Sequence, residues 1–196
     1  INNSGFQSSV RDNLTLKILE EKGFHNFINT GCPALFTNNK NNDFHQKPKS
    51  ICFSLGVSYK YSKKMFFQMK NIMIFLKSTY DLEVVLHHSP KKGDLRLMEL
   101  FSWFKDNNIK YFDISKSDKL LIETYTNCDI HIGYRVHAHI FRLSINKTSI
   151  LLAEDSRGVG LNNTIPSHIL NAYYPRRINF LNKFLIKFYK NFDHFD

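Results

Sequence analysis

The chain has 196 residues, of which 42% are hydrophobic, and this size and apolar content suit one α/β domain or one domain with part of another. Its formal net charge of +10 is compatible with a nucleic acid, an anionic membrane surface or a small anionic substrate. Three cysteines without CxxC spacing argue against a disulfide framework, and no apolar run is long enough to span a bilayer. No signal-peptide pattern follows Ile1, so we expect a cytoplasmic protein whose natural N-terminus extends further.

The first 49 residues contain two short apolar segments and then a polar stretch. Residues 6–10 and 24–29 predict strands on either side of a short helix that Asp12 can cap. Residues 38–49 are rich in Asn and Lys, which is the composition of a linker. We therefore place a domain boundary in this linker, after residues 1–37.

From residue 50 onward, apolar strands alternate with helices. Strands are predicted over residues 50–57, 82–87, 110–114, 129–132 and 148–153. Helices are predicted after the capping residues Ser62, Asp94 and Ser117, and over residues 136–145. This alternation indicates a parallel sheet covered on both faces, so residues 50–175 are predicted to form a Rossmann-like α/β domain. In such sheets, ligands bind beyond the carboxyl ends of the strands.

Residues 176–196 are predicted to form a basic amphipathic helix. Ile178, Leu181 and Leu185 fall on one side of it, and lysines fall on the others. Such a helix can lie on a membrane surface or pack against its own protein, and the sequence leaves both interpretations open.

The stretch from Cys128 to Phe141 carries the strongest sign of chemistry. An apolar strand ends at Gly133, and Arg135 and His137 follow where a helix begins. A helix start offers backbone N–H donors and a partial positive charge, and Arg135 can hold a carboxylate or phosphate with two parallel hydrogen bonds. His137 can donate to the anion or transfer a proton near neutral pH. The alternative for Arg135 is a structural ion pair, but its position after a strand and a glycine favours an anion site.

Other strand ends carry polar residues toward the same edge of the sheet. His88 follows one strand and either faces the ligand cleft or belongs to a loop. Glu154 and Asp155 end another strand, where they either bind sugar hydroxyls, act as a base or cap the segment that follows. His131 lies within a strand and His139 lies two residues beyond His137, so both are expected to be structural.

Several common sites are excluded by the motifs that are missing from the sequence. The histidine spacing does not match a HExxH helix or a zinc cluster, so no metal site is predicted. No strand is followed by a GxGxxG fingerprint, and no Walker motif, GxSxG elbow or catalytic cysteine signature occurs. No nucleic-acid-binding motif accompanies the basic charge, so a nucleic-acid partner is not predicted.

Four segments of the chain, taken in order, resemble the polysaccharide pyruvyl transferase family. The segments are Val10-Arg11-Asp12 with the helix before Gly23, Thr30-Gly31-Cys32-Pro33-Ala34-Leu35, Asp129–Phe141 with its Gly133-x-Arg135-x-His137-Ala138 core, and Asn146–Gly160. The resemblance covers residues 6–165. The chain departs from the family pattern at Tyr134, where a small residue is common, at Lys147-Thr148, where a proline is usual, and at Arg157, where a lysine is expected.

The resemblance implies a two-domain architecture similar to that of GT-B glycosyltransferases. Residues 1–37 would then be the tail of an N-terminal domain that lies mostly outside this chain, and residues 50–175 would be the C-terminal domain. The helix over residues 176–196 would return toward the N-terminal domain. We expect that this chain alone is inactive.

The resemblance also implies a reaction, which is transfer of a pyruvyl group from phosphoenolpyruvate to two hydroxyls of a sugar with formation of a ketal. The implied site has two catalytic residues, His137 and Arg135, and five substrate-binding residues, Arg11, His88, Gly133, Glu154 and Asp155. No metal or other cofactor is needed, because arginines can offset the charge of the donor. The acceptor would be a glycan or lipid-linked saccharide of a cell-surface or exopolysaccharide precursor, reached from the cytoplasm at the inner membrane surface.

Two other functions stay open at this point. A GT-B glycosyltransferase would place the diphosphate of a nucleotide sugar at the same glycine and helix start, and a non-catalytic binding module would show no turnover at all. Release of phosphate from phosphoenolpyruvate, as opposed to release of a nucleoside diphosphate, separates the two enzymes.

Overall fold

The computed structural model describes most of the chain. The described ranges are residues 5–36, 47–56, 63–89, 94–165 and 168–172. The amphipathic helix predicted over residues 176–196 and the predicted cap at Ser62 lie outside them. Among the described residues, no helix has the length and apolar character needed to cross a membrane.

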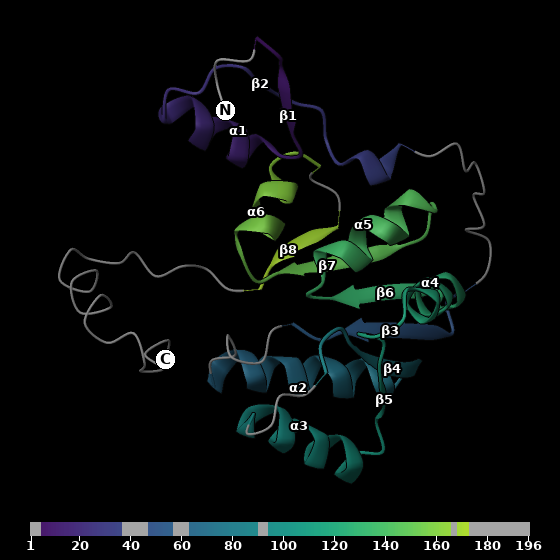
Figure 1. Ribbon diagram of the computed structural model, residues 1–196. Helices are drawn as coiled ribbons and strands as arrows, with labels where there is room; N and C mark the ends of the chain where they lie inside the picture. Colours follow the sequence, from purple (N-terminus) through teal and green to yellow (C-terminus); the bar gives the residue numbers. More distant parts are fainter. Residues whose placement is uncertain (1–4, 37–46, 57–62, 90–93, 166–167, 173–196) are drawn as a thin grey trace, which may run out of the picture.

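A six-stranded parallel sheet forms the centre of the molecule (Figure 1). Its strands are β3 (Ser50–Ser54), β4 (Asp81–Leu86), β5 (Lys110–Asp113), β6 (Ile130–Gly133), β7 (Ser149–Ala153) and β8 (Ile169–Asn171). They are arranged in the order β5-β4-β3-β6-β7-β8, and every pair is parallel. The predicted α/β Rossmann-like sheet is therefore confirmed. Because the chain leaves β3 first toward β4 and β5 and later returns to its other side as β6, the topological switch point lies between β3 and β6.

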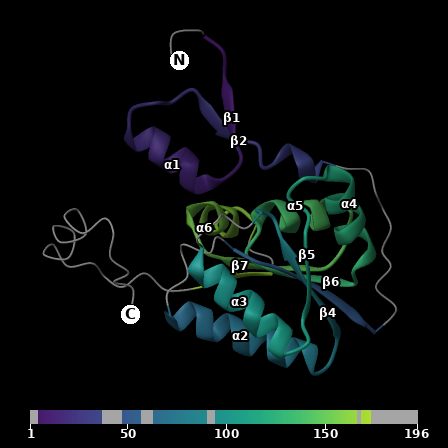
Figure 2. The same cartoon turned by 60° about the horizontal axis from the view of Figure 1, so that its bottom comes forward.

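Helices cover both faces of this sheet, as the unbroken apolar strands predicted (Figures 1 and 2). One face is covered by α2 (Lys63–Lys77) and α3 (Leu95–Asp106), which enclose a large core with alternate residues of β3 and β4, such as Phe53 and Val84. The opposite face is covered by α4 (Asp118–Asn127), α5 (Val136–Ser144) and α6 (Ser156–Asn162). The Met-rich stripe of α2, with Met65, Met69 and Met73, is buried in the first core.

Two elements of the described part of the domain were not predicted, α6 and β8. Gly158 and Gly160 lower the helix propensity of α6, and β8 has only three residues, so neither gave a clear periodic signal.

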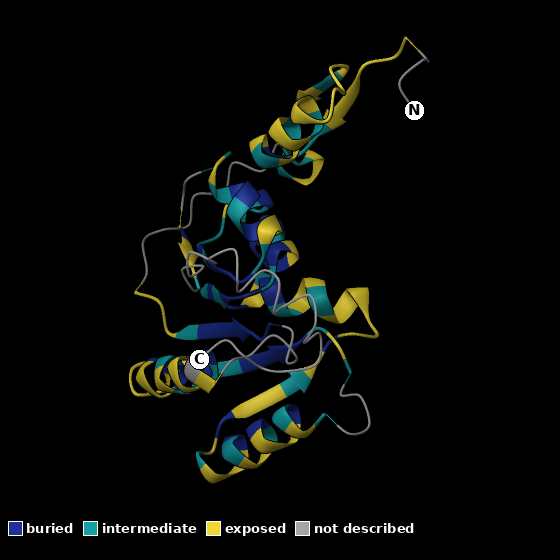
Figure 3. Cartoon of the chain, turned by 90° about the vertical axis from the view of Figure 1, so that its left-hand side faces the viewer, coloured by how far each residue is buried: buried dark blue, intermediate teal, exposed yellow. Residues whose placement is uncertain are grey.

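The N-terminal unit stands beside the domain as a small separate layer. It comprises β1 (Ser8–Val10), α1 (Asn13–Glu21), β2 (Phe27–Asn29) and the short 3-10 helix η1 (Pro33–Leu35). β1 and β2 form their own two-stranded parallel sheet, and α1 has no buried residue. Figure 3 shows how much of this unit is exposed. It contacts the domain through α6 and α5.

Arg142 is a fully buried charged residue that joins three segments of the domain. Its guanidinium donates to the carbonyls of Tyr125 and Cys128, at the end of α4, over 2.8 and 2.7 Å. It also donates to the carbonyls of Asp129, before β6, and Thr148, before β7. The guanidinium therefore supplies donors to carbonyls at the end of α4 and before β6 and β7, and it fixes where both strands begin.

Replacing Arg142 by Met should lower the free energy of unfolding by about 3–5 kcal/mol, because several buried carbonyls lose their donor. Urea unfolding measures this change. Lys105→Ala, an exposed substitution on α3, is the control and should have little effect. A loss below about 1 kcal/mol for Arg142→Met, within the usual range of a single hydrogen bond, would contradict the assigned role.

Candidate functional site

The site lies at the strand-end edge, which we define as the edge of the six-stranded sheet formed by the carboxyl ends of the strands. At the switch point, β6 ends against β3 in very close contact. Gly133 has φ of +151°, and a Cβ at this position would lie 2.6 Å from the backbone nitrogen of Ser54 and closer still to its carbonyl and hydroxyl oxygens. The glycine that was expected to bind substrate is buried, and the structure gives it a packing role.

Arg135 is the residue before α5 and is half-buried at this switch point. Its Nε donates to the carbonyl of Leu55 over 2.7 Å, and its Nη2 donates to that of Gly56 over 3.0 Å. Both carbonyls belong to the segment that follows β3. Two backbone carbonyls therefore help to hold the guanidinium, and its positive charge is fixed at the strand-end edge.

His137 lies in the first turn of α5 and is exposed. Partial burial and the positive charges of Arg157, Arg11 and Arg135 hold the pKa of its imidazole below the usual value of 6.5. Three guanidinium groups from three different segments therefore lie close enough to His137 to act on its charge. We call Arg11, Arg135 and Arg157 the arginine cluster.

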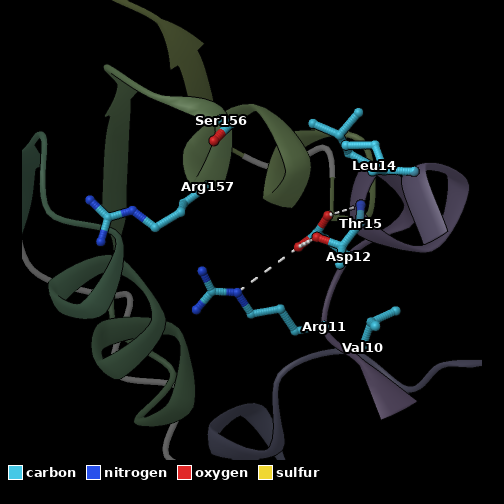
Figure 4. A pocket seen from close by; sticks show the side chains of 8 residues that line it. Val10, Arg11, Asp12, Leu14, Thr15, Ser156 and Arg157 are labelled. Atoms are coloured by element: carbon cyan, nitrogen blue, oxygen red, sulfur yellow. Dashed lines mark hydrogen bonds and ion pairs between the residues drawn. The ribbon is translucent and has the colours of Figure 1, made fainter. Parts of the chain in front are cut away.

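Two members of the arginine cluster line an open pocket between the N-terminal unit and α6, with a volume of about 260 Å³. Figure 4 shows the guanidinium groups of Arg11 and Arg157 projecting toward the same side from opposite walls. Asp155 holds Arg157 through Nε and Nη2, over 3.0 and 2.7 Å. Arg11 lies 4.0 Å from the Asp12 carboxylate, measured at its Nε. Sequence reasoning noted Arg157 as a departure from a family pattern but did not include it in the site.

Asp12 and Asn13 attach Arg11 to the domain. The Asp12 carboxylate is buried and accepts a hydrogen bond from the Thr15 backbone N–H over 2.7 Å, as the predicted cap of α1. It packs on Gly160 of α6, where a Cβ would lie 2.6 Å from its Oδ1. Next to it, the Asn13 backbone N–H donates to the hydroxyl of Thr164 over 2.9 Å. Because Gly160 has no side chain, the N-terminal unit can lie against α6 at this point.

The two acidic residues after β7 have different environments. Asp155 caps α6 by accepting from the backbone N–H of Arg157 over 3.0 Å, which is the capping role that the sequence left open. Glu154 is buried, and its carboxyl group occupies the space beside Gly56, where a Cβ would lie 2.9 Å from the Glu154 Cδ. Burial of Tyr134 raises the pKa of its hydroxyl, and the negative charge of Glu154 raises it further. Glu154 therefore lies at the strand-end edge next to the segment that Arg135 holds.

The two histidines after β4 also reach the strand-end edge. His88 is exposed, and His87 is partly buried with its Nε2 2.6 Å from the hydroxyl of Tyr125. Burial and the charges of Arg135, His88 and His137 lower the pKa of His87 to about 3. Both histidines therefore belong to the same group of side chains as Arg135 and His137, although only His88 was predicted as a site residue.

The remaining histidines of the signature stretch are structural, as predicted. His131 and His139 are both fully buried, and each has a serine hydroxyl within hydrogen-bond distance. Within the described ranges, no group of three or more His, Cys, Asp and Glu side chains is arranged to hold a metal ion.

Comparison with known proteins identifies a family for this chain. The family model described as polysaccharide pyruvyl transferase matches residues 1–156, which include the N-terminal unit and all but α6 and β8 of the described domain. No curated protein and no solved structure matches the chain.

Replacing Gly160 by Ala should detach Arg11 from the pocket while leaving the domain folded, because the added Cβ collides with Asp12 but favours the helix itself. We expect trypsin to cleave after Arg11 several-fold faster than in the wild type, with near-native circular dichroism. Asn163→Ala is the matched control, since it keeps the backbone carbonyl that accepts from Asn13. Equal cleavage of Gly160→Ala and wild type would contradict this attachment.

Proposed function

Since this chain belongs to the polysaccharide pyruvyl transferase family, we propose that it transfers a pyruvyl group from phosphoenolpyruvate to two hydroxyls of a sugar, forming a cyclic ketal and releasing phosphate. The observation that carries the proposal is the convergence of the arginine cluster on His137 at the strand-end edge. Ligands of doubly wound sheets bind at such a switch point.

The donor fits the charge of this site. Phosphoenolpyruvate has a phosphate with a charge near −2 and a carboxylate, so it needs several cations held close together. Arg135 supplies one at the switch point, and Arg11 and Arg157 supply two more across the pocket. The pocket that Arg11 and Arg157 line has a volume of about 260 Å³, which is enough space for a small anionic group.

The proposed reaction begins with a proton transfer. His137 donates a proton to the methylene carbon of the donor, which makes the adjacent carbon electron-poor, with oxocarbenium character. One sugar hydroxyl adds to that carbon, and its proton restores His137. The carbon–oxygen bond to phosphate then breaks, the second hydroxyl closes the ketal, and its proton leaves with the phosphate. The arginine cluster stabilises the negative charge of the departing phosphate.

The acceptor side of the proposal rests on fewer residues. Glu154 lies at the same edge as the arginine cluster, beside Gly56, and can accept a hydrogen bond from an acceptor hydroxyl. We propose a glycan or lipid-linked saccharide precursor as the acceptor, bound in a GT-B-like arrangement and modified at the cytoplasmic face of the membrane. His88, exposed at the same edge, is a second candidate contact for this substrate.

Phosphate release in the presence of phosphoenolpyruvate and glycan acceptors tests the function. His137→Ala should lower kcat by about 10²–10⁴-fold, because the proton donor is lost. Arg11→Ala, which removes a partly exposed side chain, should mainly weaken donor binding. Release of a nucleoside diphosphate from a nucleotide sugar, with no reaction of phosphoenolpyruvate, would contradict the proposal and would indicate a glycosyltransferase.

The matched control for His137 is His25→Ala, an exposed histidine in the N-terminal unit, which should retain wild-type activity. Arg135→Ala should be accompanied by a thermal unfolding measurement, because its guanidinium also holds the segment after β3. Full activity in both His137→Ala and Arg135→Ala would overturn the assignment of these residues.

Donor binding should also draw a proton from solution near pH 7. Partial burial and three arginines keep the pKa of His137 below 6.5 in the free protein, and the negative charge of bound phosphoenolpyruvate opposes their effect and raises this pKa. Calorimetric titration with phosphoenolpyruvate in buffers of different ionisation enthalpy measures this uptake. We expect a clear buffer dependence for the wild type and a smaller one for His137→Gln. Proton release on binding would contradict the proposed arrangement.

A further inference from the structure

The outward side of α2 carries large apolar side chains that the described part of the domain leaves exposed. Phe67 and Phe75 are 64% and 69% exposed, and Ile74 is 43% exposed. Phe67 and Ile74 are seven residues apart, which is close to two helical turns, so they lie in one stripe with Phe75 beside it. Met69 and Met73, on the inward side, are buried in the core. α2 is therefore apolar on two sides, and only one of them packs against the sheet.

α3 lies beside α2 and extends this exposed apolar region (Figures 1 and 2). Its Leu95 is 81% exposed and its Met98 is 58% exposed. The Nζ of Lys70 on α2 is 2.9 Å from the Oε1 of Glu99 on α3, so the two helices meet there. Phe67 comes three residues before Lys70, and Leu95 comes four residues before Glu99, so each lies one turn from this ion pair. We define the α2–α3 surface by six exposed residues of the two helices, Lys63, Phe67, Ile74, Phe75, Leu95 and Met98.

The charge of the α2–α3 surface is one-sided. α2 contains four lysines and no acidic residue, and Lys63 and Lys77 are exposed. α3 contains equal numbers of basic and acidic residues, so it does not cancel this charge. By contrast, α1 and α4, which also expose apolar side chains, each contain one lysine and two acidic residues. Among the described helices that expose large apolar side chains, α2 thus has the strongest positive charge.

The sign of this charge decides which occupant fits the α2–α3 surface. A second copy of the chain would bring a net charge of +10, and residues 173–196 of the chain itself contain five Lys and Arg against two Asp. Both would place like charges against α2. A membrane with anionic lipids has a negative surface potential, which attracts lysines, and a boundary with the acyl chains, which takes up exposed aromatic and aliphatic side chains. We propose that the α2–α3 surface docks the protein on an anionic lipid membrane.

This surface would hold the membrane beside the strand-end edge. Three residues separate α2 from β4, and three separate α3 from β5, so both helices end at the opposite edge of the sheet. Their first turns, which include Lys63 and Leu95, therefore lie toward the strand-end edge. A lipid-linked saccharide would extend from the membrane toward Arg135 and His137. This consequence for the acceptor rests on the proposed function, whereas the docking itself follows from the α2–α3 surface alone.

Vesicle flotation of the wild-type chain tests the docking. The vesicles contain either phosphatidylcholine alone or phosphatidylcholine and phosphatidylglycerol in equal parts. We expect binding to the anionic vesicles to be at least about tenfold tighter, because several lysines approach their surface. Added salt should release the protein, because it screens this attraction. Equal binding to both kinds of vesicle would overturn the proposal, and so would no binding to either, which would assign the α2–α3 surface to a protein partner.

Substitutions at the exposed phenylalanines test where the contact lies. Phe67→Gln and Phe75→Gln should each weaken binding to the anionic vesicles about tenfold, because an aromatic side chain no longer enters the acyl boundary. The matched control is Phe36→Gln, since Phe36 is 72% exposed in the N-terminal unit, and it should bind like the wild type. Circular dichroism verifies that each variant is folded. Unchanged binding by both Phe67→Gln and Phe75→Gln would overturn the proposal.

A lysine substitution tests the electrostatic part of the contact. Lys63→Gln should weaken binding to the anionic vesicles about fivefold and leave binding to phosphatidylcholine unchanged. Lys17→Gln is the matched control, because it removes an exposed lysine from α1, and it should bind like the wild type. Equal losses in the two lysine variants would contradict a contact through α2.

Activity with two forms of the acceptor separates failure of the docking from failure of the proposed function. With a lipid-linked acceptor in vesicles, Phe75→Gln should lower kcat/KM about tenfold, in proportion to its loss of vesicle binding. With a soluble glycan acceptor, it should match the wild type. Equal rates on the vesicle-borne acceptor would overturn the link between docking and acceptor. No reaction of phosphoenolpyruvate with either acceptor would overturn the proposed function, and vesicle flotation would still decide the docking.

Discussion

The close contact between the ends of β3 and β6 is the constraint on which the site depends. Gly133 lets the two strands meet because a side chain there would collide with Ser54. The chain then turns into α5, and the Arg135 guanidinium returns to the carbonyls of Leu55 and Gly56. The contact sets where α5 begins, and therefore where His137 stands relative to the arginine cluster. A backbone shift at this junction would displace Arg135 and His137 together, because the contact between β3 and β6 positions both residues.

The arrangement of the sheet could be predicted because it rests on local signals. Strands β3, β4, β6 and β7 are apolar enough to be recognised alone, and right-handed crossovers then imply a parallel sheet. The signature around Arg135 and His137 also stands out in the sequence. What could not be predicted depends on contacts between distant segments. The sequence around Arg142 does not show that its side chain binds carbonyls from three segments. The sequence around Arg157 likewise does not show that it lines the same pocket as Arg11.

The polar content of the α4–α5 face deserves a physical explanation, because buried hydroxyls and imidazoles are costly unless they are paired. His131 pairs with Cys52 of β3 and with Ser149 of β7, and Ser54 lies two residues after Cys52, on the same face of β3. A slip of either strand by one residue would move these groups to the opposite, apolar face. The hydrogen bonds of His131 with Ser54 and Ser149 therefore help to specify the register of the central strands.

The small N-terminal unit has a consequence for how strongly the pocket can hold a ligand. Since α1 buries none of its own residues and lies against α6 mainly through Asp12 and Asn13, its docking rests on these contacts and on the packing of η1 against α5. The observed affinity is then the intrinsic affinity multiplied by the docked fraction, and a ligand that bridges Arg11 and Arg157 raises that fraction. Mutations far from the chemistry, at the surface between α1 and α6, would thus tune affinity without altering any atom that touches the ligand.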